Sequence, residues 1–419
     1  MGSFSFGSGN AAQLLRIPLH LVGRAVTFVV PRRGDRWVFG CAVGIADGAL
    51  ALWEHAQAAG ERGVWLVTGP AQAAQARARG IPSVPAASLR GFWLTARAGI
   101  VVVTHGLGDV NRYATPGAFV VQLWHGIPLK RIGLDSPVTT RPPLPIPGLR
   151  RLIETAYRRT QRRIRLLPAA SHLVRGRLET AFGLDESRIP VTGEPRVDVL
   201  SRGTAEGRRD AARARLADLI GPVGEDTRLV LYAPTWRDGD PDPGVPSPDQ
   251  WRALVAVLEA QDAVLLIRSH PLGRGEYRPP VPTDRVRALG GDLVADVTPL
   301  LPGFDVLITD YSSLIYDSAL VPVPVVFLAP DLPAYTATRG FYGRYRDVAG
   351  ADVAVDWDAA SAQLEAVLGD ETERERRIAR ARALSERVHA FRDGRNTARV
   401  YQAIVRRRRR AGRRRRGAE

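Results

Sequence analysis

Short apolar runs separated by stretches with helical patterning constrain the fold of this chain more than any other feature. In the first half the runs are GVWLVTG (63–69), GIVVVTHG (99–106), AFVVQLWHG (118–126) and a run near LPAASHL (167–173). In the second half they are RLVLYAPTW (228–236), DAVLLIRSHP (262–271), DLVADVT (292–298), DVLITDYSS (305–313) and VPVVFLAP (323–330). Runs rich in Val, Ile and Leu that alternate with helices predict parallel sheets covered by helices on both faces.

Two such series, joined near residue 200, predict an α/β protein with two Rossmann-like domains that face each other across a cleft. A length of 419 residues is sufficient for two domains with cores of their own. We divide the chain into an N-terminal amphipathic segment (1–33), a first Rossmann-like domain (34–200), a second one (201–405) and an Arg-rich tail (406–419). An Arg/Ala-rich helix is expected to begin the second domain and to end at Gly221.

The formal net charge of +16 indicates anionic partners, which include phosphorylated substrates, anionic lipid and nucleic acid. Nine arginines lie in the tail, which we interpret as a lipid-binding element; a disordered end and a nucleic-acid contact are the alternatives. The segment AAQLLRIPLHLVGRAVTFVVPRR is too interrupted by polar residues to span a membrane. It is either an interfacial helix or a first core-packing helix. We expect a cytoplasmic protein bound peripherally to the inner face of the membrane.

A single cysteine, Cys41, excludes an internal disulfide framework, and there is no CxxC pair or His/Cys cluster of the kind that holds zinc. Nor do we see a DxD-like acidic cluster that is reserved for a metal. We therefore expect neither a metal nor a cofactor.

Ligands of open α/β sheets bind at the carboxyl ends of the strands, so the polar residues that follow the apolar runs are candidate site residues. His125 follows the run FVVQLW, and an imidazole there can take a proton from a hydroxyl group. Gly126 would let the backbone approach a ligand closely. A lone histidine is more often a core residue, but its position beside Lys130 and Arg131 favours a functional role.

Further candidates follow the runs of the second half. Thr235 and Arg237 lie in YAPTWRD, and Arg268 and His270 lie in LIRSHP. Arg339 opens the segment RGFYGRY. The planar guanidinium group binds phosphate with two parallel hydrogen bonds, so arginines at strand ends predict an anionic ligand.

The stretch ITDYSSLIYD continues beyond the end of a predicted strand, and two serine hydroxyl groups and a carboxylate follow that strand directly. If Ser312 and Ser313 begin a helix, their hydroxyls and the exposed backbone N–H groups would bind an anion such as a diphosphate. Asp310 would repel that anion, so we expect it to cap the helix or to hold an arginine or histidine. An ordinary Asp/Ser helix cap without a ligand is the alternative.

Taken together, the motifs resemble the CDP-glycerol glycerophosphotransferase family, the teichoic acid primases and polymerases of bacterial cell walls. They are WHGIPLKRIG, TGEPRVD, LYAPTWRD, IRSHP, ITDYSSLIYD, APDLPAY, RGFYGRY and FRDGRNTARV, and they extend from about Trp37 to Ile404. The resemblance implies a GT-B architecture. It also implies that a hydroxyl of a lipid-linked acceptor attacks the β-phosphorus of a CDP-polyol and that CMP is released.

The resemblance further implies roles for individual residues. His125 would be the general base, and His270 would bind or protonate the diphosphate. The other matching positions would bind substrate (Gly126, Thr235, Arg237, Arg268, Ser312, Ser313 and Arg339) or orient these groups (Asp310 and Asp317). The sequence departs from the family pattern at Gly48, Glu194 and Val197, which leaves the acceptor and the polyol open.

Two other functions fit parts of the sequence. A GT-B glycosyltransferase would share the fold but would release a nucleoside diphosphate instead of CMP. A non-catalytic nucleic-acid-binding protein would depend on the basic tail alone. Because nothing in the body resembles an RNA- or DNA-binding module, we do not expect nucleic acid to be a partner.

Overall fold

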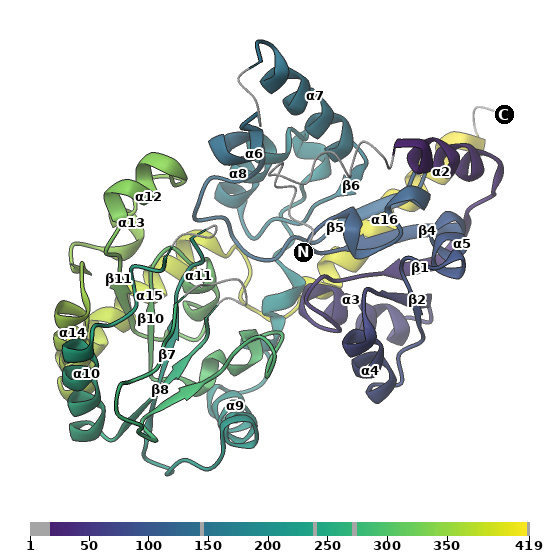
Figure 1. The fold of residues 1–419 in the computed structure, drawn as a ribbon. Coiled ribbons are helices and arrows are strands. Elements are labelled where there is room, and N and C mark those ends of the chain that lie inside the picture. Colours follow the sequence, from purple (N-terminus) through teal and green to yellow (C-terminus); the bar gives the residue numbers. More distant parts are fainter. Residues whose placement is uncertain (1–16, 143–145, 238–240, 270–274, 417–419) are drawn as a thin grey trace. The chain divides into compact units, whose positions relative to one another are not determined.

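The computed structural model describes residues 17–142, 146–237, 241–269 and 275–416, and the chain forms two compact units in it (Figure 1). Unit 1 comprises Met1–His125, Arg131–Asp198 and His389–Glu419. Unit 2 comprises Gly126–Lys130 and Val199–Val388. Each unit is an α/β body around one parallel sheet, which confirms the predicted fold class.

The sheet of unit 1 has the order β3-β2-β1-β4-β5-β6, and all of its pairings are parallel. Its strands are β1 (Arg33–Phe39), β2 (Arg62–Val67), β3 (Ser83–Pro85), β4 (Ala98–Val103), β5 (Phe119–Gln122) and β6 (Ile164–Leu166). The helices of this unit are α2 (Ile17–Val29), α3 (Asp47–Ala58), α4 (Pro70–Ala78), α5 (Leu89–Arg97), α6 (Pro137–Thr140), α7 (Leu149–Gln161), α8 (His172–Phe182) and α16 (Asn396–Arg416).

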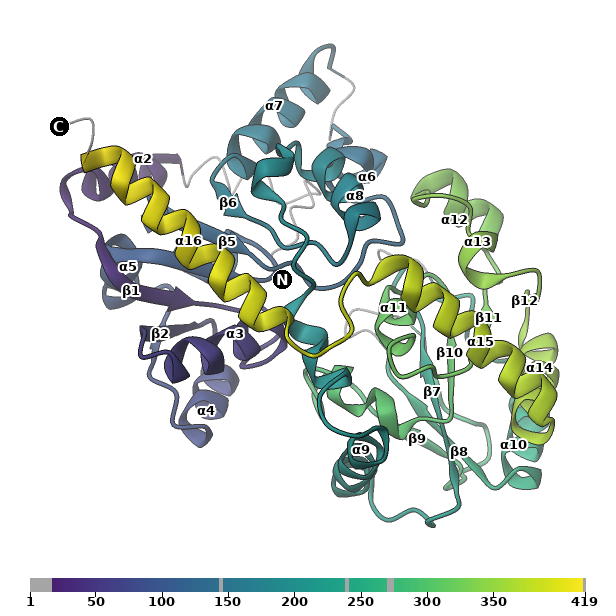
Figure 2. The same cartoon turned by 180° about the vertical axis from the view of Figure 1, so that it is seen from behind.

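Alternate residues of the central strands enter separate cores on the two faces of this sheet. Trp37 and Phe39 of β1 belong to one core together with residues of α3, whereas Val38 belongs to the other. Figure 2 shows α16 lying across the first face, where Val400 and Ile404 are fully buried. Burial of both faces explains why the strands are almost continuously apolar at their carboxyl ends.

The sheet of unit 2 has the order β12-β11-β10-β7-β8-β9 and is also parallel. Its strands are β7 (Arg228–Ala233), β8 (Ala263–Ile267), β9 (Val286–Ala288), β10 (Val306–Thr309), β11 (Val325–Leu328) and β12 (Val353–Ala354). The helices are α9 (Ala205–Ile220), α10 (Pro248–Ala260), α11 (Leu314–Ser318), α12 (Leu332–Thr338), α13 (Arg346–Ala349), α14 (Trp357–Gly369) and α15 (Glu371–Val388). Helices α10 and α14 cover one face through Trp251, Leu254, Trp357 and Leu364.

In both sheets the strand order reverses between the first and fourth strands in chain order, which is the Rossmann arrangement. The reversal lies between β1 and β4 in unit 1, and between β7 and β10 in unit 2. These two points are where an open α/β sheet binds its ligands.

Most predicted strands are confirmed, but one lies slightly earlier, one is wrong and one was missed. The strand expected near 167–173 is β6, which ends at Leu166, and α8 begins at His172. No strand forms over 292–298, and the edge strand β9 lies earlier. The central strand β1 was missed because its first residues are charged and exposed. Helix α9 ends before Gly221, as predicted.

The sequence division placed residues up to 405 in the second domain, whereas α16 packs in unit 1. Val400 and Ile404 are the reason, because they complete the apolar core on that sheet. Asp198 fixes the beginning of this helix: its carboxylate accepts hydrogen bonds from the backbone nitrogens of Asn396 at 2.9 Å and Thr397 at 2.8 Å. The helix continues through Arg416, so the interpretation of the tail as a disordered end does not fit its backbone.

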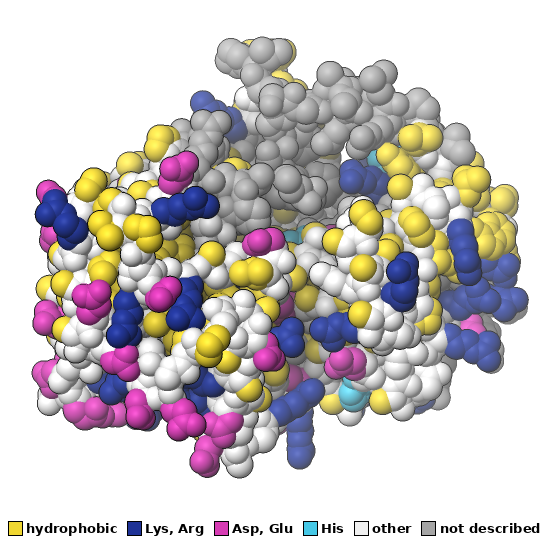
Figure 3. All heavy atoms as spheres, turned by 60° about the horizontal axis from the view of Figure 1, so that its bottom comes forward, with side chains coloured by type: hydrophobic (Ala, Val, Ile, Leu, Met, Phe, Trp, Pro, Cys, Tyr) yellow, Lys and Arg dark blue, Asp and Glu magenta, His cyan; other side chains and the backbone are white. Residues whose placement is uncertain are grey.

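Charge is distributed very unequally between the units. Unit 1 contains 36 lysines and arginines against 14 acidic residues, whereas unit 2 contains 23 against 29. The face drawn in Figure 3 carries side chains of both signs. The positive charge of the chain therefore belongs to unit 1, and any anionic partner of large size is expected there.

Candidate active site

The predicted site residues of unit 2 lie at the point where its strand order reverses. Thr235 and Arg237 follow β7, and Asp310, Ser312 and Ser313 follow its neighbour β10. The backbone nitrogen of Thr235 donates a hydrogen bond of 2.9 Å to Oδ1 of Asp310. The fold thus brings together two motifs that are about 75 residues apart in the sequence.

Arg237 is the centre of this arrangement. Its Nη2 lies 2.8 Å from Oδ2 of Asp310, and its Nε and Nη2 donate to the two carboxylate oxygens of Asp331 at 2.8 and 3.0 Å. The guanidinium group also lies over the rings of Tyr311 and Tyr335, 4.9 and 5.1 Å from their centroids. The expectation that Asp310 holds an arginine is confirmed.

These contacts keep Arg237 and Asp331 ionised. Burial opposes the charge on Arg237, but the two carboxylates raise its pKa above the ordinary value. Burial also acts to raise the pKa of Asp331, yet hydrogen bonds from Arg237 and Tyr311 hold it below the ordinary value. Because most of its donors are occupied, the contacts favour a positioning role for Arg237; that it binds substrate stays a prediction.

A cluster of aromatic side chains connects the ion pairs of Arg237 to the segment that begins at Arg339. The rings of Tyr311 and Tyr335 stack with centroids 4.0 Å apart, and Phe341 and Tyr345 pack against Tyr311. The hydroxyl of Tyr345 donates to the carbonyl oxygen of Asp310 at 2.9 Å. Arg339, half-buried at the end of α12, is thereby fixed near the same strand end.

The serines of this motif begin a helix, as predicted. Ser313 is the N-cap residue of α11, and Oγ of Ser312 accepts a hydrogen bond of 3.2 Å from the backbone nitrogen of Leu314. Both serines are partly exposed, whereas Asp317 in α11 is only 1% exposed. Asp317 therefore lies within the protein, as an orienting residue would.

The remaining two predicted residues of unit 2 follow β8. The guanidinium group of Arg268 donates to the backbone carbonyls of Val294 at 2.8 Å, Ala295 at 3.2 Å and Leu289 at 3.3 Å. These bonds favour a structural role, in which Arg268 fixes the segment after β9. His270 lies outside the described residues.

In unit 1, His125 follows β5 and stacks against a second histidine, His105, which follows the neighbouring strand β4. The two rings are parallel to within 3°, and their centroids are 4.3 Å apart. Trp124 packs on His125 with a centroid distance of 4.1 Å. The pairing of Val103 with Gln122 sets this geometry, because it brings the residues after both strands to the same edge of the sheet.

The segment that carries His105 is fixed by Asp109. One carboxylate oxygen of Asp109 accepts hydrogen bonds from the backbone nitrogens of Thr104 at 2.9 Å and His105 at 2.8 Å. The hydroxyl of Thr104 lies 2.8 Å from Nδ1 of His105. Burial lowers the pKa of His105, although the carboxylates of Asp109 and Asp47 act to raise it. Burial thus favours the neutral form of His105.

The backbone around His125 takes conformations that side chains disfavour. Trp124 has φ +64°, in the left-handed region, and Gly126 has φ +135°. Such conformations cost about 1–3 kcal/mol for residues other than glycine and are concentrated at functional sites. At position 126 the backbone therefore requires glycine.

Sequence reasoning missed His105, Asp109 and Asp331. A signal for His105 was present: the apolar runs of β4 and β5 both end in a His-Gly pair, at 105–106 and 125–126. Asp331 lies in the motif APDLPAY, but that motif did not show its partner Arg237, which is 94 residues away in the sequence.

Residues 25–406 match the family model described as CDP-Glycerol:Poly(glycerophosphate) glycerophosphotransferase. The teichoic acid poly(glycerol phosphate) polymerase of Staphylococcus epidermidis is 31% identical over 54% of this chain and 31% of its own length. The teichoic acid glycerol-phosphate transferase of Staphylococcus aureus is 27% identical over 70% of this chain and 72% of its own length. The match thus spans less than a third of the first relative and about 72% of the second.

Solved structures of the wall teichoic acid polymerase TagF share the fold. One superposes with a TM-score of 0.74 at 22% identity and covers 93% of this chain and 92% of that one. A TagF variant soaked with CDPG has a TM-score of 0.73. Because the family model covers nearly the whole chain, the protein belongs to the CDP-glycerol:poly(glycerophosphate) glycerophosphotransferase family.

Proposed function

We propose that this protein transfers glycerol phosphate, or a related polyol phosphate, from a CDP-polyol to a hydroxyl of a lipid-linked acceptor, in the synthesis of teichoic acid or a related polymer. The observation that carries the proposal is the meeting of the family's motifs at the strand-order reversal of unit 2. There the PTWR and DYSS motifs touch directly through Thr235 and Asp310.

In the proposed reaction the acceptor oxygen forms a bond to the β-phosphorus of the donor. The bond from that phosphorus to the oxygen that bridges to the α-phosphorus breaks, and CMP leaves with the bridging oxygen. The hydroxyl proton passes to His125 as general base, which contributes a factor of roughly 10²–10⁴. The roles of His270, Ser312, Ser313 and Arg339 toward the diphosphate follow from the family motifs.

We further propose that His105 is a positioning residue for His125. A neutral imidazole stacked on the ring of the base restricts its rotation without adding a charge that would suppress proton uptake. Thr104 and Asp109 hold His105 in turn. A base fixed in this way is ready to accept the proton when the acceptor hydroxyl arrives.

Membrane association is proposed from α2 and the basic character of unit 1. Phe28 and Val29 are 91% and 75% exposed, while Gly23 on the same helix packs against Tyr113. An apolar face turned outward beside arginines is typical of an interfacial helix. Among the described residues, no helix has the length and apolar character needed to cross a membrane. We place the protein at the cytoplasmic face, bound peripherally.

The test of the proposed activity is acceptor-dependent release of CMP from CDP-glycerol and, separately, from CDP-ribitol. A short soluble glycerol-phosphate acceptor removes the requirement for a membrane. CMP released only when acceptor is present supports polyol-phosphate transfer and identifies the polyol. Release of a nucleoside diphosphate from a nucleotide sugar would instead assign the protein as a glycosyltransferase.

A further inference from the structure

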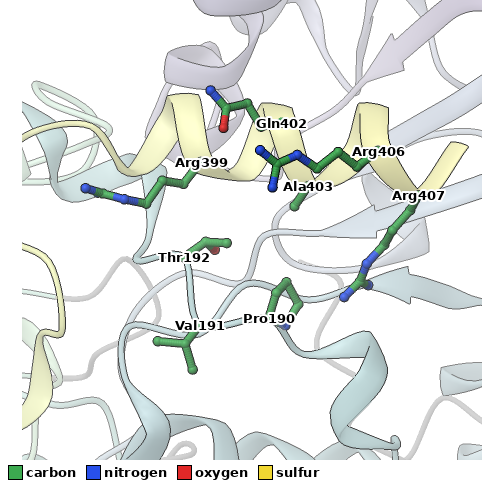
Figure 4. A pocket seen from close by; sticks show the side chains of 8 residues that line it. All are labelled: Pro190, Val191, Thr192, Arg399, Gln402, Ala403, Arg406 and Arg407. Carbon is green, nitrogen blue, oxygen red and sulfur yellow. The ribbon is translucent and has the colours of Figure 1, made fainter. Parts of the chain in front are cut away.

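A groove in unit 1 lies between α16 and the segment 190–192 (Figure 4), and neither histidine of the stacked pair lines it. Its volume is about 410 Å³. Pro190, Val191 and Ala403 give it apolar walls, and polar side chains of α16 line it at helical spacing: Arg399, Gln402, Arg406 and Arg407. Positions separated by three, four and seven residues lie on one face of a helix, so the helix presents these groups to the groove together. We call this feature the α16 groove.

Two of its arginines are held in place by the protein. Both Nη atoms of Arg399 donate to the carboxylate of Asp393, and the guanidinium group lies 3.9 Å from the centroid of the Phe391 ring. Because this charge is already paired, Arg399 shapes the groove, and Arg406 and Arg407 are its candidate anion-binding residues. Nη1 of Arg407 donates to the carbonyl oxygen of Arg165 at 2.9 Å. Arg406 is exposed at the rim. Guanidinium groups fixed in this way lose little side-chain entropy when they bind an anion.

Further arginines lie beside the groove. Arg165 and Arg188 offer their backbone carbonyls to Arg407. Burial and the neighbouring Arg165 lower the pKa of Arg188, against the opposing effect of Asp185. Arginines that repel one another in this way favour a bound anion, which would relieve the repulsion. Unit 1 as a whole also carries an excess of positive charge, which favours an anionic ligand.

We propose that the α16 groove binds phosphate ester groups of the acceptor, an inference that rests on the proposed function. Guanidinium groups recognise phosphate oxygens, and the apolar walls suit the carbon atoms between successive phosphates. The phosphate can belong to the polyol-phosphate chain or to the head of its lipid anchor. Nucleic acid is not favoured, because sites for single strands use aromatic side chains as stacking platforms and no aromatic residue lines this groove.

The test compares three variants of the full-length protein by calorimetric titration with a short glycerol-phosphate oligomer. Arg406→Gln removes a rim charge, and Gln402→Glu places a carboxylate in the groove. Arg395→Gln removes an exposed charge that lies directly before α16 and does not line the groove. We expect Arg406→Gln to raise the Kd about three- to tenfold and Gln402→Glu to raise it further. Arg395→Gln should leave the Kd unchanged, and the KM for CDP-glycerol should not move in any variant.

A second titration with vesicles that contain a lipid-linked diphosphate identifies the source of the phosphate. Weaker binding of either ligand by Arg406→Gln supports the proposal. The ligand whose binding weakens shows whether the phosphate belongs to the polyol-phosphate chain or to the lipid head. Equal Kd values for Arg406→Gln and Arg395→Gln with both ligands would overturn it, as would an effect confined to a single-stranded oligonucleotide. If the wild-type protein releases no CMP but Arg406→Gln weakens its binding of the oligomer, the proposed activity is wrong and the phosphate-binding role of the groove is supported.

Discussion

The imidazole rings of His105 and His125 lie parallel, with their centroids 4.3 Å apart, at the carboxyl ends of two neighbouring strands. Two stacked imidazoles at this distance cannot both carry a proton without strong repulsion. Burial lowers the pKa of His105, so the neutral form of its ring is favoured. This relationship is the basis for the different roles that we propose for the two histidines, one chemical and one positional.

Replacing the base should abolish turnover without unfolding the protein. His125→Gln replaces the imidazole with an amide of similar size. Because the amide cannot take up the proton of the acceptor hydroxyl, we expect kcat to fall by roughly 10²–10⁴. Acceptor-dependent CMP release measures kcat, and circular dichroism checks the fold. Turnover near that of the wild type would remove His125 from the mechanism.

Replacing His105 should show whether its ring supports His125 by stacking or whether its own protonation matters. His105→Phe retains a flat ring against His125, whereas His105→Ala leaves the base without support on that side. We expect about a tenfold lower kcat for the alanine variant, an unchanged donor KM and substantial recovery in the phenylalanine variant. Equal kcat values for both variants and the wild type would show that His105 does not position the base.

His105 should also make stability depend on pH in one direction. Its folded-state pKa lies below the unfolded value of about 6.5, so the unfolded chain takes up a proton that the folded protein does not. Stability is therefore complete above that pH and decreases as the pH falls below it. Thermal unfolding from pH 8 to pH 5 should show a smaller decrease in His105→Phe than in the wild type. Because the pKa of His20 is lowered too, some decrease should remain in the variant.

The carboxylate pair that holds Arg237 should be required for donor binding. Asp331→Asn removes one charge from a network whose arginine side chain is only 6% exposed, and we expect a loss of about 1–3 kcal/mol in unfolding free energy. The KM for CDP-glycerol should rise, because the network fixes the segments that carry Ser312 and Arg339. Urea unfolding and donor titration measure the two effects.

A matched control for this variant is Asp347→Asn, which breaks the surface pair with Arg344, whose side chain is 87% exposed. That pair should contribute little to stability, because solvent screens both exposed charges. Equal destabilisation by the two substitutions would contradict a special role for Asp331.

The turn after His125 should accept no side chain at Gly126. Gly126→Ala forces a residue with a Cβ atom to φ +135°, which should cost about 1–3 kcal/mol and displace the adjacent base. A reduced melting temperature together with reduced kcat is expected. An alanine variant with wild-type stability and activity would show that the turn relaxes freely.

The sequence was sufficient to predict the fold class and the strand ends that carry polar residues, because buried parallel strands leave long apolar runs. It did not reveal β1, whose first half is charged, or β12, which has only two residues. Nor could it show that Arg237 forms ion pairs with Asp310 and Asp331, since these residues meet only in the folded protein. The assignment of α16 to unit 1 depends on Asp198 and Thr397, which are 199 residues apart.

The most direct test of the central claim is to follow the β-phosphorus of the donor. CDP-glycerol labelled with ³²P at the β-position is incubated with the full-length protein and a soluble glycerol-phosphate acceptor. The account predicts that the label moves to the acceptor while unlabelled CMP is released, and that His125→Gln prevents both. Label that stays on a released nucleoside diphosphate, or an acceptor that gains no phosphorus, would contradict polyol-phosphate transfer.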